Sequence, residues 1–151
     1  MLYITYKPQL LSINTKNWLS MNTRYLVEVN FTFDLSVQVD SFKGQSHFCV
    51  RKDQLNDFVS SFSKLPFETL LEDNDSDAFL KVKSTDTDVL MVEGQLGGSH
   101  EACYLKFSFE THFEQIESFS LELQKLLLFV DNPEAEERYE EFKKTNSGKT
   151  H

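Results

Sequence analysis

The chain of 151 residues contains few cysteines and few glycines, and each shortage excludes a class of protein. Its two cysteines are too few for the disulfide framework of a small secreted protein. The expected strands place Cys103 on an apolar face and Cys49 on a polar one, which argues against a disulfide between them and fits a reducing compartment. The five glycines are scattered, so the sequence has no glycine-rich loop that could cradle a phosphate group.

Long hydrophobic runs and basic side chains are scarce as well. No stretch approaches the roughly 20 apolar residues that a membrane-spanning helix needs. Residues 1–11 have neither the charged leader nor the unbroken apolar run of a signal peptide, so we expect a cytoplasmic protein. With 24 acidic and 15 basic side chains, the formal net charge is −9. This charge repels phosphate groups, so neither nucleic acid nor an anionic membrane is expected as a partner.

Phenylalanine, in contrast, is abundant: the chain has 14, and its hydrophobic fraction is 40%. Phenylalanine buries a large area and brings no polar group to satisfy, so this composition favours one domain with a substantial core. From residue 27 to residue 39 every odd position is apolar: Val27, Val29, Phe31, Phe33, Leu35, Val37 and Val39. This alternation predicts a long strand with one buried face, bent or broken near Asp34.

Two amphipathic helices are expected in the middle and near the end of the chain. Asp53 is the expected N-cap of a short helix that ends before Pro66. A second, more apolar helix is predicted over about Phe113–Val130. Residues 132–144 are predicted to form a highly charged helix, and residues 145–151 a disordered tail.

Turn residues separate several further strand candidates. Ser41–Gln45 is typical of a turn in which Gly44 supplies the permissive backbone angle. The acidic segment Glu68–Asp77 is expected to be a loop. Short β-prone runs predict the remaining strands: Leu2–Tyr6, Ser46–Val50, Phe79–Lys83, Val89–Gln95 and Ala102–Thr111. The sequence therefore predicts a single α+β domain over residues 1–131, with a mainly antiparallel sheet of about six strands and two amphipathic helices packed on one face.

No motif for catalysis, a cofactor or a metal is found in the sequence. Gly97-Gly98-Ser99-His100 resembles part of a nucleophile elbow, but it lies between two expected strands and not between a strand and a helix. No two of the four histidines have the close spacing of a zinc site. The alternating carboxylates of Asp73–Asp77 lack both the central glycine and the closing glutamate of a calcium loop. We therefore expect a binding protein that is not an enzyme.

A pattern of apolar positions extends over roughly residues 25–130. It includes Ser41-Phe42-x-Gly44, Asp53-x-Leu55-x-x-Phe58, Val92-x-Gly94 and Leu105-x-Phe107-x-Phe109-Glu110-Thr111, followed by a helix with Phe119 and Leu126-Leu127. This pattern resembles the WapI-type immunity protein family, small bacterial proteins that neutralise a contact-dependent toxin. The resemblance implies stoichiometric inhibition of a toxin, which needs no active site. The long N-terminal segment and the charged C-terminal helix depart from the family pattern.

Toxins of such systems are often nucleases with basic clefts, and an acidic inhibitor is steered to a basic cleft electrostatically. Solubility alone would also account for the acidity. The expected contact surface is the acidic loop with the next turn: Glu72, Asp73, Asp75, Asp77, Asp86 and Asp88. The second choice is the charged helix: Glu136, Glu137, Glu140 and Glu141. The alternative is that this helix face contacts no partner and is only solvated, with Glu140 paired to Lys143 and Lys144.

Two other hypotheses remain at this point. The stripe of Ala135, Tyr139 and Phe142 on the charged helix would allow the chain to self-associate as a homodimer. An enzyme of an unrecognised type would instead show a deep pocket with convergent titratable groups.

Overall fold

The computed structural model describes residues 2–3, 7–27, 30–63, 66–85, 87–100 and 103–131. The charged helix and the tail predicted after residue 131 lie outside this range, together with Glu136, Glu137, Glu140 and Glu141. The first half contains β1 (Leu2–Tyr3), β2 (Gln9–Leu11), β3 (Trp18–Val27), β4 (Asn30–Val39), β5 (Phe42–Arg51), α1 (Lys52–Ser60) and a 3-10 turn, η1 (Ser61–Ser63). The second half contains β6 (Glu68–Glu72), β7 (Phe79–Ser84), β8 (Val89–Leu96), β9 (Leu105–His112) and α2 (Phe113–Asp131).

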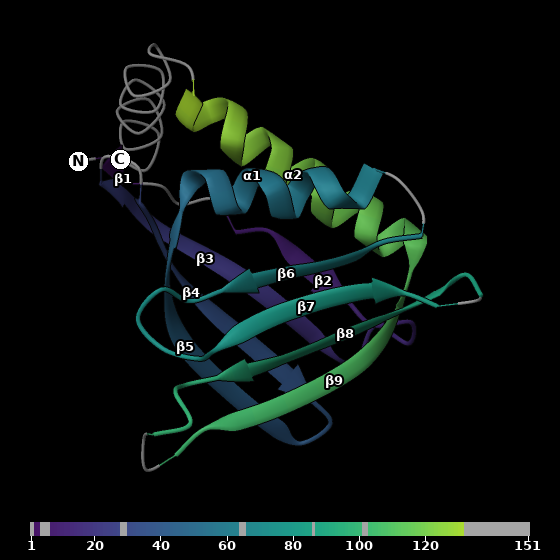
Figure 1. Ribbon diagram of the computed structural model, residues 1–151. Coiled ribbons are helices and arrows are strands. Elements are labelled where there is room, and N and C mark those ends of the chain that lie inside the picture. Colours follow the sequence, from purple (N-terminus) through teal and green to yellow (C-terminus); the bar gives the residue numbers. More distant parts are fainter. Residues whose placement is uncertain are drawn as a thin grey trace, which may run out of the picture.

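The strands form two antiparallel sheets, which confirms the α+β class. The first sheet has the order β1-β3-β4-β5, with β2 also paired to β3, and the second has the order β6-β7-β8-β9. The prediction of about six strands in one sheet is wrong, since the described residues form five strands in one sheet and four in the other. Apart from the additional β1, each half has the same order of elements, four consecutive antiparallel strands followed by a helix (Figure 1).

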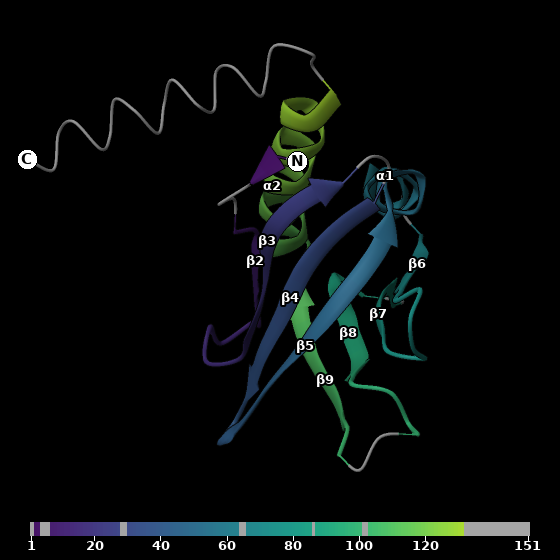
Figure 2. The same ribbon diagram turned by 90° about the vertical axis from the view of Figure 1, so that its left-hand side faces the viewer.

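The two helices lie at the seams between the sheets, at one end of the molecule (Figures 1 and 2). Helix α1 contacts β5 of the first sheet and β6 of the second, and α2 contacts β2 and β9. The expectation that both helices pack on one face of one sheet is therefore wrong. The physical reason is connectivity, because α1 joins the edge strand of one sheet to the edge strand of the other.

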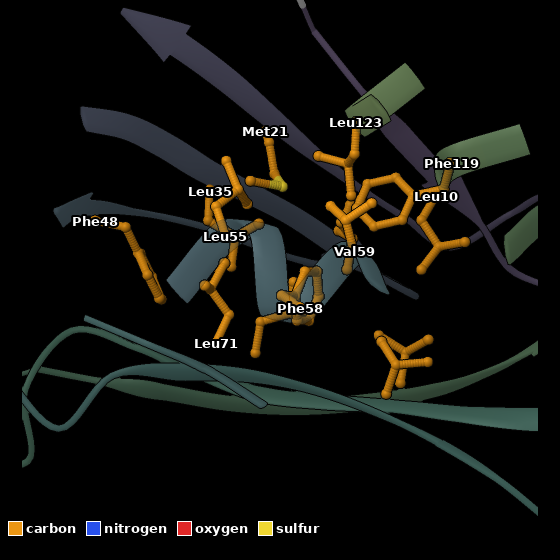
Figure 3. Packing of buried hydrophobic residues seen from close by; sticks show 14 of the residues in the cluster. Leu10, Met21, Leu35, Phe48, Leu55, Phe58, Val59, Leu71, Phe119 and Leu123 are labelled. Atoms are coloured by element: carbon orange, nitrogen blue, oxygen red, sulfur yellow. The ribbon is translucent and has the colours of Figure 1, made fainter. Parts of the chain in front are cut away.

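The core fills the space between the sheets (Figure 3). Phenylalanines of β4 and β5, Phe31, Phe33 and Phe48, are fully buried in one cluster with side chains of α1 and α2. The apolar face predicted for the second helix is confirmed: Ile116, Phe119, Leu123, Leu126 and Leu127 are all buried. None of the helices in the described part of the chain is both long and apolar enough to cross a membrane.

Two glycines mark places where backbone or side chains come very close. A Cβ on Gly44 would lie 2.8 Å from Leu105 Cδ2 and 2.9 Å from Leu96 Cδ1. A Cβ on Gly94 would lie 2.6 Å from the carbonyl oxygen of Phe79. Gly44 thus brings β5 against the second sheet, and Gly94 lets β7 and β8 pair closely beneath Phe107.

The expected turn around Gly44 is displaced. The connection between β4 and β5 is Asp40-Ser41, since Val39 pairs with Phe42. Asp40 adopts the left-handed conformation with φ of 54°, which aspartate tolerates, while Gly44 pairs with Val37 inside the ladder. Gly44 is therefore required by packing and not by a turn.

The alternation from residue 27 to residue 39 crosses two strands. Val27 ends β3, and β4 begins at Asn30 and continues through Asp34 without a break. A break near Asp34 is therefore wrong, since the chain leaves β3 before Asn30. Three strands were also missed: β2 and β3 begin in a segment that the sequence left unassigned, and β6 occupies the start of the segment expected to be a loop.

The first helix begins two residues earlier than predicted. Arg51 is the N-cap, and its N–H donates to Gln54 Oε1 at 2.7 Å. Asp53 lies in the first turn, where its carboxylate accepts a bond from Arg51 Nε at 3.1 Å. This hydrogen bond lowers the pKa of Asp53. The buried positions of the predicted helix, Leu55, Phe58, Val59 and Phe62, are confirmed.

Candidate functional site

The acidic loop between β6 and β7 is partly structural. Asp73 is only 8% exposed, and its Oδ1 accepts a hydrogen bond from Cys49 N–H at 2.9 Å. Asn74 N–H donates to the Cys49 carbonyl oxygen at 2.9 Å, and Ser76 Oγ donates to Asp73 Oδ2 at 2.7 Å. The loop therefore closes part of the edge of β5, and both carboxylate oxygens of Asp73 accept hydrogen bonds from within the chain.

Asp77 is also held by internal hydrogen bonds. Its Oδ1 accepts bonds from Ser99 N–H at 2.8 Å and from Gln95 Nε2 at 3.1 Å, and its Oδ2 accepts a close bond from the Ser99 hydroxyl. These bonds lower the pKa of Asp77, with the Ser99 hydroxyl as the main cause. Asp77 thus fixes the loop after β8, and the Ser99 hydroxyl donates to a carboxylate there.

The other predicted contact residues are separated in space. Glu72 and Asp75 are exposed at the β6–β7 end of the second sheet. Asp88 is exposed in the β7–β8 turn, at the opposite end of β7 (Figure 1). The six residues of β7 separate these loops by about 20 Å. Asp86 lies outside the described residues. The expectation that the two turns form one acidic surface is therefore wrong, because loops at opposite ends of a strand cannot meet.

A cleft of about 590 Å³ lies near this acidic loop. It is bounded by the start of β5, the loop after β6, the end of β8 and the residues that lead into β9. Its polar lining includes Lys43, Ser46, His47, Asp73, Asp75, Ser76, Cys103 and Tyr104. One wall is fixed by the backbone N–H of Gly97, which donates to Ser46 Oγ at 3.0 Å.

The thiol of Cys49, next to the acidic loop, is not an activated nucleophile. His47 Nδ1 lies 3.2 Å from Oδ1 of Asp34, a carboxylate that is buried on the outer side of β4. Burial raises the pKa of the Cys49 thiol, and the charges of Asp75 and Asp73 raise it further. A thiol with a raised pKa is mostly protonated at neutral pH and reacts poorly.

A second, apolar groove of about 290 Å³ lies on the other side of Leu105. It is lined by the end of β4, the start of β5 and the first half of β9: Val37, Val39, Asp40, Phe42, Leu105, Lys106, Phe107 and Ser108. Leu105 lines both hollows and packs at Gly44. We call the end of the sheets that carries the cleft and the groove the helix-distal end, since both helices lie at the other end (Figures 1 and 2).

Two large aromatic side chains are exposed at the helix-distal end. Phe42 is 68% exposed beside the groove, and Tyr104 is 50% exposed beside the cleft. Neither was predicted as a contact residue. The sequence did contain a signal for Phe42. A large aromatic side chain within a predicted polar turn is not expected to be buried in the core, so it is a candidate contact residue. Exposed aromatics with a partly apolar hollow are typical of protein interfaces.

No group of three or more histidine, cysteine, aspartate or glutamate side chains in the described part of the chain is placed to hold a metal ion. In comparisons with family models, curated proteins and solved structures, nothing matches the chain. The resemblance to the WapI-type immunity family therefore stays a prediction.

Replacing Asp73 by alanine is expected to lower the free energy of unfolding by about 1–3 kcal/mol, because the partly buried N–H of Cys49 loses its acceptor. Asp75→Ala is the matched control, since Asp75 is exposed in the same loop and should change stability by less than about 0.5 kcal/mol. Urea unfolding of both variants measures the difference. Equal stabilities would contradict the structural role of Asp73.

Proposed function

We propose that this chain is a non-enzymatic cytoplasmic protein that binds a basic protein partner through the helix-distal end. The observation that carries the proposal is the exposure of Phe42 and Tyr104 on either side of the Gly44–Leu105 contact, each beside a hollow. Exposed aromatic side chains are costly to leave in water and dominate binding energy when a partner covers them.

The charge of the protein supports a basic partner. The formal net charge is −9, and the exposed acidic residues near the helix-distal end include Asp40, Glu72 and Asp75. A negative field raises the association rate of a basic protein and falls off with added salt. Asp73 and Asp77 contribute to this field from fixed positions, although their oxygens are engaged within the chain.

The resemblance to the WapI-type immunity family supports the more specific proposal that the partner is a bacterial toxin. An inhibitor of this kind needs a rigid surface and no chemistry. The raised pKa of the Cys49 thiol beside the cleft is consistent with that role.

Affinity capture from a lysate of the native organism tests the proposal. The wild-type chain is compared with the double variant Phe42→Ala/Tyr104→Ala and with Leu70→Ala, which removes an exposed apolar side chain from the outer face of the second sheet. We expect the wild type and Leu70→Ala to capture one basic protein that high salt releases and that is inactive while bound. Capture of the same protein by the double variant, or failure to capture a partner shown to be expressed, would contradict the proposal.

A second candidate function is self-association, and the outer face of α2 favours it. Leu121 and Leu128 are exposed on the same side of the helix, two turns apart, with the exposed Lys125 between them. This face ends near Asp131, from which the chain continues into residues 132–151. A homodimer should dissociate in Leu128→Lys and after truncation at Asp131. Sedimentation equilibrium that gives a monomer for the wild-type chain would exclude it.

A further inference from the structure

Other parts of the chain close the edge strands β5 and β9 at one point each. Asp73 and Asn74 close the edge of β5 at Cys49. At β9, the edge strand of the second sheet, Ile13 N–H donates to the carbonyl oxygen of Glu110 at 3.1 Å. The chain therefore already starts a strand-like pairing along the free side of β9.

The first half of β9 is different. Because the Glu110 carbonyl points away from β8, the alternation of an antiparallel ladder turns the N–H and C=O groups of Ser108 and Lys106 outward as well. Within the described part of the chain, these outward backbone groups have no hydrogen-bond partner. An open row of this kind is a template for another strand.

The open row borders the apolar groove. Leu105 and Phe107 line it from β9, while Val37, Val39 and the exposed Phe42 line it from the first sheet. A strand laid beside β9 would project alternate side chains into this groove and the others toward solvent. Asp40 at the groove and Glu110 farther along β9 favour basic residues toward the ends of the added strand, while Lys106 disfavours a basic residue directly opposite it.

We propose that β9 binds an extended segment of the partner as an added strand, hydrogen-bonded to Lys106 and Ser108. The segment has apolar side chains at alternate positions, which enter the groove, uncharged polar residues between them and basic residues at its ends. This inference rests on the proposed function and names the mode by which the partner is recognised. It continues the pairing that Ile13 makes with Glu110 by one or two residue pairs toward the start of β9.

Amide hydrogen exchange measured by NMR on the full chain tests the added strand. The probe is the blocked heptapeptide Lys-Val-Thr-Val-Thr-Val-Lys at millimolar concentration. In the free protein, the amides of Lys106 and Ser108 should exchange rapidly, while those of Phe107 and Phe109, bonded to β8, should be protected. The peptide should slow exchange at Lys106 and Ser108 about tenfold or more and shift the methyl signals of Val37 and Val39. Absence of protection on β9 would overturn the proposal.

Two blocking changes make the test specific. Ser108→Pro removes the outward N–H while leaving the ladder to β8 intact, and should weaken peptide binding about tenfold, whereas Ser108→Ala should bind like the wild type. A peptide N-methylated at alternate residues should fail to bind the wild-type chain, which provides the same test if Ser108→Pro does not fold. Equal binding by Ser108→Pro or by the N-methylated peptide would overturn the added strand. If Ser108→Pro still captures the basic partner at full affinity, the strand is wrong while the proposed function stands.

Discussion

Phe119→Ala is expected to lower the free energy of unfolding by about 3–5 kcal/mol, the largest effect of any single change considered for this protein. Phe119 lies on α2 and is completely buried. Its ring centroid is 6.3 Å from that of Phe62 in an edge-on arrangement, so it joins α2 to η1 at the end of α1. Alanine would leave a cavity where the helices meet the two sheets, and close-packed surroundings collapse only partly around such a cavity.

Leu128→Ala is the matched control for Phe119→Ala. Leu128 lies on the same helix but is 70% exposed, so its replacement should change stability by less than about 0.5 kcal/mol. Chemical denaturation followed by far-ultraviolet circular dichroism measures both variants. A loss at Leu128 as large as that at Phe119 would mean that α2 is covered on its outer side, which would favour self-association over the monomeric inhibitor.

The double variant Phe42→Ala/Tyr104→Ala should weaken binding of the basic partner by about 30- to 1000-fold, equivalent to about 2–4 kcal/mol. Both side chains are exposed and contribute little to the core, so the fold should tolerate their removal. Most of the loss should appear in the dissociation rate, because aromatic contacts form after the charges have brought the proteins together.

Surface plasmon resonance with the captured partner separates these contributions. Asp75→Asn should mainly lower the association rate and its dependence on salt, since Asp75 is an exposed charge beside the cleft. Leu70→Ala should change neither rate. If the aromatic variant binds as tightly as the wild type, the partner uses another surface, and the helix-distal end is not the binding site.

The elements with a strong single pattern could be predicted from the sequence. Helix α2 repeats apolar residues at helical spacing over five turns, and the structure confirms its range to within one residue at the C-terminal end. Strands β8 and β9 show clear alternation and turn residues at their ends, and both are present close to the predicted positions.

Strands β3 and β6 could not be predicted, for identifiable reasons. Strand β3 has a register shift between Thr23 and Tyr25, which interrupts its alternation. In β6 the buried positions are Thr69 and Leu71, while Leu70 faces outward. The order of polar and apolar residues in the sequence therefore does not reveal which side of this strand is buried. Without these two strands, the remaining ones suggest a single sheet.

The three aspartates of the acidic loop show the same limit at the level of a site. In the sequence, Asp73, Asp75 and Asp77 are equivalent members of one acidic run. In the structure, Cys49 and Ser99, distant in sequence, bind Asp73 and Asp77 and leave Asp75 exposed. No local pattern distinguishes a carboxylate that accepts a buried N–H from one that faces water.

Composition and periodicity by themselves determined the class of this protein: an acidic α+β domain with a phenylalanine-rich core and two amphipathic helices. These features are local, because they depend on the spacing of apolar residues along one segment. Only the tertiary structure decided that the strands divide into two sheets, that Gly44 is a packing contact, and that Phe42 and Tyr104 remain exposed at the same end. Each of these depends on which distant segments meet, and the free energy of such contacts is not encoded in the pattern of any single segment.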